Sequence, residues 1–408
     1  MRDRICIACG RRLPKEPLLQ LENMPSSAQN IPDKEQIKED KGISLSLCRC
    51  AACGLVQFDC EPVDYYRDVI RSGGYSTTMV NLRRRQYRHL IDTWHLEGKR
   101  FLEAGCGQGE FLSVLREFPV EVFGIEHRQP LVDMAREKGL NVWRQFTENE
   151  DTVIEGPQDN QKGPYDVFLS FNFLEHQPEP VKMLKCIYNN LSEDGMGLVT
   201  VPSLEYILNY DGYYELIRDH LAYYTFETLE YVLGLAGFQV LEREMVNRDT
   251  LSVVVKKMPA DWRMTDSHRE ETAEREPAEN TGDFGGLKAS EETIQRETLN
   301  LIQELHQNGE RLAVWGASHQ GFTLASTTGL GDKVSYMIDS APFKQNRFAP
   351  ASHIPIVPPD YYFKEPVEAI LIVAPGYTEE ISGIIRERFG GQVKQFTLRS
   401  SHIERLSL

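Results

Sequence analysis

Long hydrophobic runs are absent from this sequence. Nowhere among its 408 residues do 18 apolar residues follow one another, and a membrane-spanning helix needs about that length. The first residues, MRDRICIACGRRL, also lack the apolar stretch of a signal peptide. We therefore expect a cytoplasmic protein with no membrane partner. Disulfides are rare in the cytoplasm, so the eight cysteines need another explanation.

Basic residues are too few to balance the acidic ones. The chain has 45 Lys and Arg against 61 Asp and Glu, which gives a formal net charge of -16. Binding to a phosphate backbone relies on clustered positive charge, so we expect no nucleic-acid partner. The composition, with 41% hydrophobic and 10% aromatic residues, is typical of a folded protein. The length favours two or three domains.

Cysteines are concentrated near the N-terminus, where six of the eight fall within the first 60 residues. Cys6 and Cys9 form one CxxC pair, Cys50 and Cys53 form a second, and a glycine suited to a tight turn follows each pair. Two such pairs can place four thiolates around one zinc ion. We predict a structural Zn2+ site, although its 40-residue gap is wide and Cys48 is a competing ligand. Unmetallated thiols and a redox site are the alternatives.

A glycine-rich loop follows the first strongly predicted strand. The stretch RFLEAGCGQGEFLSVL, residues 100–115, has the pattern of a strand, a loop and a helix. Glycines let the backbone approach a cofactor, and a helix start supplies amide groups. The candidate cofactor-binding residues here are Glu103, Gly105, Gly107 and Gly109, with Glu126 at the end of the next strand to hold ribose hydroxyls.

This ExGxGxG form resembles motif I of class I S-adenosylmethionine-dependent methyltransferases, whereas a dinucleotide-binding loop normally contains GxGxxG. The later stretch YDVFLSFNFLEHQPEP resembles the fourth-strand motif of the same enzymes. That resemblance implies that Phe171, at the end of the strand, lies near the cofactor. A nicotinamide enzyme and a degenerate Rossmann core are the alternatives.

The periodicity of apolar residues predicts an α/β protein. We expect helices over residues 79–96 and 291–309, and little regular structure in the first 70 residues. The predicted segments are a zinc-binding domain (1–72), a class I methyltransferase core with a Rossmann-like sheet (73–258), a charged linker (259–293) and a second Rossmann-like domain (294–408).

With these units in this order, the chain resembles the three-domain sugar C-methyltransferase family. These enzymes methylate a carbon of a keto-sugar that is linked to a nucleotide diphosphate. The resemblance covers nearly the whole chain. Besides the CxxCG pairs and the ExGxGxG loop, the matching segments are NMPSSAQ (23–29), GYS (74–76), LEHQPEP (174–180), DHLAYYT (219–225), VWGASHQG (314–321) and DSAPFKQNRFAPASHIPI (339–356).

The resemblance implies four catalytic residues. The family's proposed general base maps onto His220, with Asp219 in place of the more usual Glu, and Tyr75 and His176 map near the reacting methyl group. A neutral histidine is suited to removing a proton from carbon, and Asp219 would hold its ring or raise its basicity. A packed histidine, a turn histidine and an interface tyrosine are the structural alternatives.

Two departures from the better-known members concern the substrate. Ile217 and Arg218 stand where those enzymes have Tyr-His, and the C-terminal glycine loop contains His319 and Gln320. Arg218 is suited to an anionic group that the familiar sugars lack. The candidate substrate-binding residues are Gln29, Arg218, Tyr223, His319 and Lys344.

The expected function is S-adenosylmethionine-dependent C-methyl transfer to a nucleotide-linked keto-sugar, by a monomer or a dimer. The first alternative is an O- or N-methyltransferase acting on a small metabolite. The second is a non-catalytic, zinc-containing binding protein.

Overall fold

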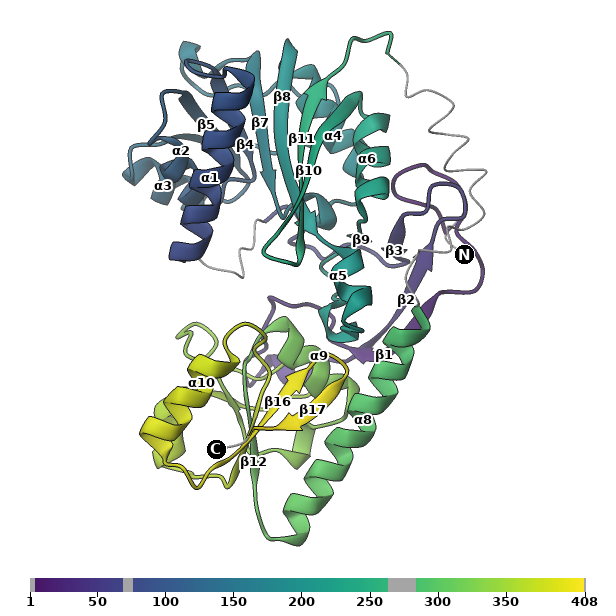
Figure 1. Ribbon diagram of the computed structural model, residues 1–408, viewed down its shortest axis with the longest axis vertical. Helices are drawn as coiled ribbons and strands as arrows, with labels where there is room; N and C mark the ends of the chain where they lie inside the picture. Colours follow the sequence, from purple (N-terminus) through teal and green to yellow (C-terminus); the bar gives the residue numbers. More distant parts are fainter. Residues whose placement is uncertain (1–3, 69–75, 263–283, 407–408) are drawn as a thin grey trace.

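Two α/β units and an N-terminal sheet make up the structure, a computed structural model that describes residues 4–68, 76–262 and 284–406. Figure 1 shows the two units one above the other, with the N-terminal strands at their junction. None of the helices among the described residues is long and apolar enough to cross a membrane.

The first α/β unit is built on a seven-stranded sheet whose order is β6-β5-β4-β7-β8-β11-β10. The strands from β6 to β8 are parallel, whereas β11 runs antiparallel to both of its neighbours. The strands are β4 (Arg100–Ala104), β5 (Glu121–Glu126), β6 (Asn141–Arg144), β7 (Tyr165–Phe171), β8 (Leu191–Pro202), β10 (Phe238–Val246) and β11 (Thr250–Lys257). The predicted class I methyltransferase sheet is confirmed.

Helices cover both faces of this sheet because each carries an apolar stripe. They are α1 (Thr77–Trp94), α2 (Glu110–Leu115), α3 (Gln129–Glu137), α4 (Pro180–Asn189) and α6 (Phe226–Leu235). Helix α5 (Leu204–Asn209) instead lies at the junction (Figure 1) and packs in a core shared with the second α/β unit. Short 3-10 turns are η2 (Asp159–Gln161), η3 (Leu174–His176) and η4 (Tyr213–Glu215). Ser76 caps α1 by accepting a hydrogen bond from the Met79 amide at 3.3 Å.

The second α/β unit has the strand order β14-β13-β12-β15-β16-β17. Counted along the chain this is the Rossmann order 3-2-1-4-5-6, with only β17 antiparallel to its neighbour. The strands are β12 (Leu312–Trp315), β13 (Met337–Ile338), β14 (Ile356–Val357), β15 (Ala369–Ile372), β16 (Lys394–Arg399) and β17 (His402–Arg405). The prediction of a second Rossmann-like domain is confirmed.

The helices of this unit are α8 (Phe284–Gln307), α9 (His319–Thr327) and α10 (Thr378–Ile384), with turns η5 (Gly331–Lys333), η6 (Pro359–Phe363) and the π-helical η7 (Ile385–Phe389). Helix α8 begins at Phe284, so the prediction that a linker extends to residue 293 is wrong. Leu287 is fully buried and joins the core. It therefore anchors the first turn of α8, which could not be predicted from the polar residues around it.

The N-terminal segment forms a four-stranded antiparallel sheet, and the prediction of little regular structure there is wrong. Its order is β1-β2-β3-β9. The strands are β1 (Leu19–Met24), β2 (Ile43–Arg49), β3 (Val56–Phe58) and β9 (Ala222–Tyr223), with a turn η1 (Gln36–Lys38) between β1 and β2. Because β9 lies two residues after His220, the segment that carries the proposed base is fixed to this sheet.

The N-terminal residues contribute to two hydrophobic cores. Leu21 and Leu47 pack in one core with Leu301 and Leu324 of the second α/β unit. The cysteines of the CxxC pairs pack in another core with Leu229 and other residues of the first unit. The long gap between the two CxxC pairs is thus occupied by strands that connect both units.

Candidate active site

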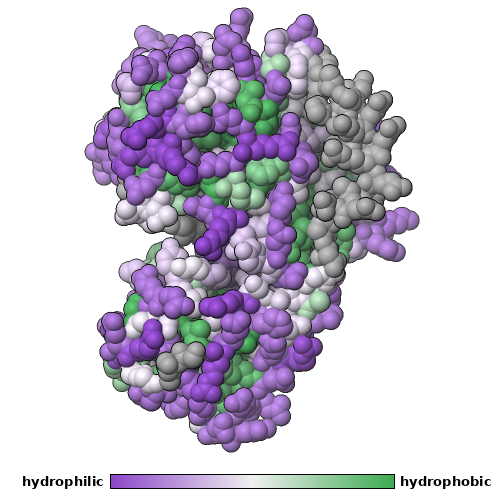
Figure 2. Space-filling model, viewed as in Figure 1, coloured by the Kyte–Doolittle hydropathy of each residue, from purple (hydrophilic) through white to green (hydrophobic). Residues whose placement is uncertain are grey.

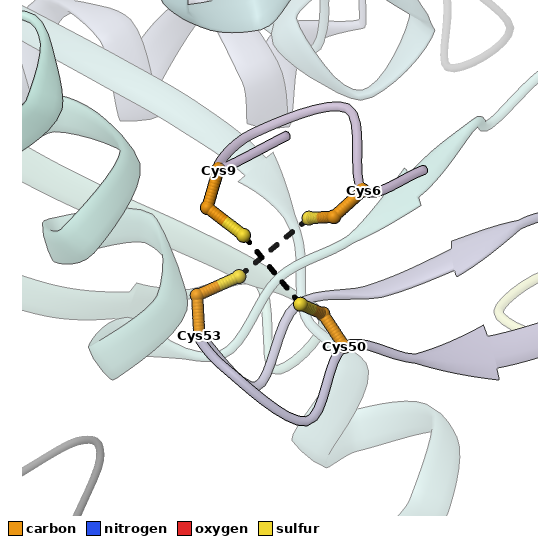
Figure 3. Close-up of side chains that lie close together, drawn as sticks. All are labelled: Cys6, Cys9, Cys50 and Cys53. Atoms are coloured by element: carbon orange, nitrogen blue, oxygen red, sulfur yellow. Dashed lines mark hydrogen bonds between the residues drawn. The ribbon is translucent and has the colours of Figure 1, made fainter. Parts of the chain in front are cut away.

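The four predicted metal ligands lie together (Figure 3). Two of the separations between sulfurs are 3.6 Å for Cys6 to Cys53 and 3.5 Å for Cys9 to Cys50. Four sulfurs placed tetrahedrally about 2.3 Å from a zinc ion would be about 3.8 Å apart, so the cluster fits such an ion. Cys48 does not join it, because its sulfur accepts a hydrogen bond from Arg4 at 3.1 Å.

The glycine loop after β4 has the conformation that the sequence predicts. Gly105, Gly107 and Gly109 have φ values of 71°, 58° and 76°, which side chains with a Cβ atom rarely adopt. A Cβ atom on Gly109 would also lie 2.3 Å from a methyl carbon of Leu140. These three positions therefore require glycine, one of them for close packing as well.

Glu126 holds the same loop from the neighbouring strand. Its carboxylate accepts hydrogen bonds from the Gly107 amide at 3.0 Å and the Arg128 amide at 2.9 Å. Burial raises the pKa of this carboxyl group, against the opposing effect of the two amides. Glu103 is fully buried in β4 beneath the loop. The two acids thus lie where a cofactor loop needs them.

Phe171, at the end of β7, is 3% exposed, and its place near the cofactor stays a prediction. Its ring packs edge-to-face on Phe111, with centroids 5.7 Å apart, and the Arg83 guanidinium lies 3.7 Å from its centroid. Because successive side chains of a strand point to opposite faces, the following residue takes the other direction. Asn172 lines the cavity described next.

A cavity of about 660 Å3 lies where the two α/β units meet, and Figure 2 shows the surface indented between them. Asn172 and Pro202 reach it from the carboxyl ends of β7 and β8. Gln320 reaches it from the first turn of α9, the helix that follows β12, and Gly376 from the loop after β15. Ligands of open α/β sheets bind at such strand ends. Here both sheets direct theirs toward one cavity.

Two histidines and their neighbours form one wall of this cavity. The rings of His176 and His220 lie edge-to-face with centroids 4.9 Å apart, and both residues line the cavity. The Leu221 amide donates to the Glu175 carbonyl at 2.8 Å, and the Phe58 amide donates to the Leu221 carbonyl at 3.0 Å. His220 is therefore held between the turn after β7 and strand β3.

Asp219 does not hold the His220 ring, so that part of the prediction is wrong. Its carboxylate accepts hydrogen bonds from the Tyr65 hydroxyl at 2.5 Å and the Ala28 amide at 2.9 Å, which meet its need for donors. Its backbone carbonyl accepts a hydrogen bond from His176 Nδ1 at 2.8 Å. Asp219 thus binds the loop before Gln29 on one side and orients His176 on the other.

Burial sets the protonation of the wall. Burial, and then the nearby His176 and His319, holds the pKa of His220 well below its usual range. Burial also lowers the pKa of His176, against the opposing effect of Asp219. Glu175 is 1% exposed, and burial raises its pKa to about 8. At neutral pH the two histidines are unprotonated and Glu175 carries a proton.

Two predicted substrate-binding residues lie away from the cavity. Tyr223 is 1% exposed, and its hydroxyl accepts a hydrogen bond from the Ile217 amide and donates to the Ile217 carbonyl. Lys344 donates to the Ala317 carbonyl at 2.8 Å and to Asp339 at 3.0 Å. Both side chains hydrogen-bond to the backbone of their own domain. The geometry therefore favours a structural role for each of them over direct contact with the substrate.

The other three substrate candidates surround the cavity. Gln29 and His319 line it, and the His319 Nε2 atom lies 3.2 Å from Glu215. Arg218 instead lines an adjoining cavity of about 910 Å3, which Gln29 also borders. Its guanidinium donates to the backbone carbonyls of Ser26 and Glu61, so it supports the loop before Gln29. Tyr75 lies outside the described residues.

Three residues of the site carried no assigned role in the sequence interpretation. Glu175 belongs to the LEH motif, so the motif itself was the available signal. Tyr65 holds Asp219, and Glu215 accepts hydrogen bonds from Gln320 at 2.7 Å and from His319. Nothing in the local sequence around Tyr65 or Glu215 marks them, because their importance depends on contacts 104 to 154 residues away.

Comparisons with known proteins agree with this geometry. Residues 79–243 match the family described as a methyltransferase domain, and residues 250–394 match the C-methyltransferase C-terminal domain. The chain is similar to the C-methyltransferase NovU of Streptomyces niveus, with 23% identity over 291 residues that cover 70% of this chain and 68% of NovU.

Two further similarities each cover less than half of this chain. A ubiquinone biosynthesis O-methyltransferase of Idiomarina loihiensis is 30% identical over 100 residues, which cover 24% of this chain and 41% of that protein. The crystal structure of the magnesium protoporphyrin IX methyltransferase of Synechocystis PCC 6803 has a TM-score of 0.34 and 16% identity, and the match covers 44% of this chain and 83% of that one.

Proposed function

Because the chain belongs to the C-methyltransferase family and is an S-adenosylmethionine-dependent enzyme, we propose that it methylates a carbon next to the ketone of a nucleotide-diphosphate-linked keto-sugar. The observation that carries the proposal is His220, an unprotonated histidine on the wall of a cavity to which both α/β units contribute. Such a cavity can hold a two-part substrate, with its sugar beside one unit and its nucleotide beside the other.

S-adenosylmethionine, when bound, supplies the methyl group that the substrate carbon takes up. The residues present fit it, because three glycines with positive φ leave the loop after β4 open to close approach. Glu126, at the end of β5, has two carboxylate oxygens beside that loop to accept from ribose hydroxyls. Loop amides would contact the amino-acid part.

His220 acts on the substrate. Its unprotonated ring takes the proton from the carbon next to the ketone, and the electron pair of that C–H bond forms the enolate. The enolate carbon is then the nucleophile, and the proton on His220 passes to solvent. The Gln29 amide and the Tyr206 hydroxyl line the same cavity and are suited to donate hydrogen bonds to the enolate oxygen.

His176 is a positioning residue. Its Nδ1 atom must carry the proton that the Asp219 carbonyl accepts, which leaves Nε2 of the neutral ring without one. Since it packs against His220 and holds the backbone one residue before it, His176 fixes the place of the base. Asp219 completes this support through Tyr65 and Ala28.

The four-cysteine cluster is proposed to hold a structural zinc ion. All four ligands come from the protein, so the ion would have no open position for substrate. Its role is to fix the knuckles beside β3 and, through β3, the segment that carries His220. Metal analysis of the purified protein tests this, with one zinc ion per chain as the expected result.

The test of the proposed function is exchange of the proton next to the ketone. A nucleotide-linked keto-sugar is incubated in deuterium oxide with the enzyme and S-adenosylhomocysteine, so that no methyl transfer competes. We expect deuterium at that carbon with the wild-type protein, and no deuterium with His220→Ala. His89→Ala is the matched control, because His89 is exposed on α1 and should leave exchange unchanged.

Exchange that persists in His220→Ala would contradict the role of His220. An enzyme that transfers methyl groups to a hydroxyl or an amine without any such exchange would instead favour the O- or N-methyltransferase alternative. Failure to bind S-adenosylmethionine in calorimetry would contradict both and favour a binding protein.

A further inference from the structure

Arg248 is the single arginine or lysine among the described residues that line the histidine cavity. It lies at the tip of the β10–β11 hairpin, where Val246 and Thr250 are the last paired residues. Arg218, where the sequence suggested a positive charge for the substrate, borders the adjoining cavity instead. The cation available to a ligand of the histidine cavity is therefore Arg248.

The charge of Arg248 has no partner among the described residues. No ion pair or hydrogen bond joins its guanidinium to a carboxylate within the parts of the chain that the structure describes, and its side chain is exposed. Three of the four acids that line the cavity accept hydrogen bonds from other groups, and the fourth, Glu175, is 1% exposed. Asp219 accepts from Tyr65 and Ala28, Glu215 accepts from Gln320, and Asp249 accepts from Thr250.

The turn does not explain why an arginine is there. Arg248 has a φ of 74° and Asn247 has a φ of 52°, and hairpin turns with such values favour glycine, asparagine or aspartate. Asparagine meets this preference at the first position, whereas arginine at the second adopts a conformation that glycine would adopt without strain. A ligand in the cavity can therefore use the guanidinium of Arg248, which the turn itself does not require.

Arg248 and the proposed base line the same cavity. In the sheet, β11 is separated from β7 by β8 alone, so the two strands are two spacings of about 4.8 Å, or roughly 10 Å, apart. His176 follows β7 and packs on His220, whereas Arg248 precedes β11. One ligand can therefore place a sugar ring at the histidines and a phosphoryl group on its anomeric oxygen at Arg248.

We propose that Arg248 binds the diphosphate of the substrate and thereby selects a phosphate-linked sugar over a free one. This inference rests on the proposed function and specifies where its substrate is held. Gln320 and Gly376 line the cavity from the second α/β unit, so the diphosphate would lie between the hairpin tip and that unit. A guanidinium matches phosphate oxygens with paired, charge-assisted hydrogen bonds.

The test is calorimetric titration of inorganic pyrophosphate into the full-length protein. We expect binding by the wild type, about tenfold weaker binding by Arg248→Gly, since a hydrogen bond to a charged group contributes about that factor, and intermediate binding by Arg248→Lys. Glycine suits the turn, so this variant should fold. Asn247→Gly is the matched control, because it changes the same turn without removing charge, and its affinity should equal that of the wild type.

Equal affinity of wild type and Arg248→Gly, or no pyrophosphate binding by the wild type, would overturn the proposal. The proposal would also be overturned if acetate bound to the wild type as tightly as pyrophosphate does, because Arg248 would then bind a carboxylate. Deuterium exchange in a nucleotide-linked keto-sugar, measured in parallel, separates the two proposals. Normal exchange by the wild type, together with an unaltered pyrophosphate affinity in Arg248→Gly, rejects the role of Arg248 alone. No exchange by the wild type, together with a weakened pyrophosphate affinity in Arg248→Gly, rejects the reaction alone.

Discussion

At the scale of single residues, Glu175 combines deep burial with an incomplete set of hydrogen bonds. Its Oε2 atom is buried and makes no hydrogen bond within the described parts of the chain, and the nearest imidazole nitrogen, His176 Nε2, is 3.9 Å from Oε1. An ionised carboxylate without donors would be costly to bury. Protonation removes that cost, which is why burial raises the pKa to about 8.

The pH dependence of stability should report this proton. The ordinary pKa is 4.5 and the folded-state pKa is about 8, so the folded protein binds the extra proton between these values. Stability therefore falls as pH rises through this window, by up to about 1.4 kcal/mol per pH unit. In Glu175→Gln this contribution should vanish, and urea unfolding at several pH values measures the difference in slope. Identical slopes in both proteins would show that Glu175 is ionised when folded.

His220 should set the acid limit of activity. Burial and two nearby histidines hold its pKa well below 6.5, so the base stays unprotonated until the pH is well below that value. The acid limb of kcat/KM should accordingly lie below pH 6.5. His319→Gln should move the limb upward, because His319 lowers the pKa of His220, and an amide can still donate to Glu215. An acid limb above pH 6.5 in the wild type would contradict this prediction.

At the scale of elements, β9 links the cysteine cluster to the active site. Val56 and Gln57 of β3 pair with Tyr223 and Ala222 of β9, and β3 begins three residues after Cys53. Four protein ligands around one ion would therefore stabilise a strand that begins two residues after His220. The proposed ion would take no part in the chemistry but would help to fix the position of the proposed base.

Removal of a cysteine ligand should therefore impair catalysis. Cys53→Ser should lose its zinc ion, as measured by metal analysis, and should show at least tenfold lower methyl transfer together with a lower melting temperature. Cys48→Ser is the matched control, because Cys48 is equally buried but lies outside the cluster. A zinc-free Cys53→Ser protein with full activity would separate the cluster from the active site.

The sequence predicts elements well where periodicity is strong and poorly where it is short. Strand β7 coincides with the apolar start of the stretch YDVFLSFNFLEHQPEP, because a long apolar run requires burial. Strand β3 has three residues and β9 has two, which is too few to show alternation, so the N-terminal sheet was missed.

The candidate site divides in the same way. The motifs bring Gln29, His176, His220 and His319 to one cavity, as the resemblance implies. The contacts of Asp219, Tyr223 and Phe171 could not be predicted, because a motif fixes a residue's place in the chain but not the direction of its side chain. Each of these three side chains meets a partner that only the tertiary structure supplies, such as Tyr65 for Asp219.

At the scale of the whole molecule, the N-terminal strands hold the two α/β units together. Leu47 of β2 is fully buried in a core shared with the second unit, and Arg347 and Phe348 of that unit bind the backbone of Ile31 and Pro32. The N-terminal strands therefore hold the two walls of the cavity in place, and the shape of the cavity depends on residues that do not line it.

Leu47→Ala should weaken this support. Truncation of a buried leucine costs about 2–5 kcal/mol, and here the loss falls on the core that joins the N-terminal sheet to the second unit. We expect a lower melting temperature and faster proteolysis between the units. Leu18→Ala is the control, because Leu18 is 39% exposed and its truncation should change stability little. Equal melting temperatures for the two variants would contradict a shared core.

The hydrogen bond from the Asn23 side chain to the Ser326 carbonyl joins residues 303 positions apart. During synthesis, the ribosome releases β1 and β2 long before the surface that covers them exists. Contacts of such high sequence separation slow folding and leave apolar strands open to aggregation. Nascent chains that stop before residue 284 should consequently depend on chaperones, and the yield of soluble enzyme should depend on how quickly the last third of the chain is made.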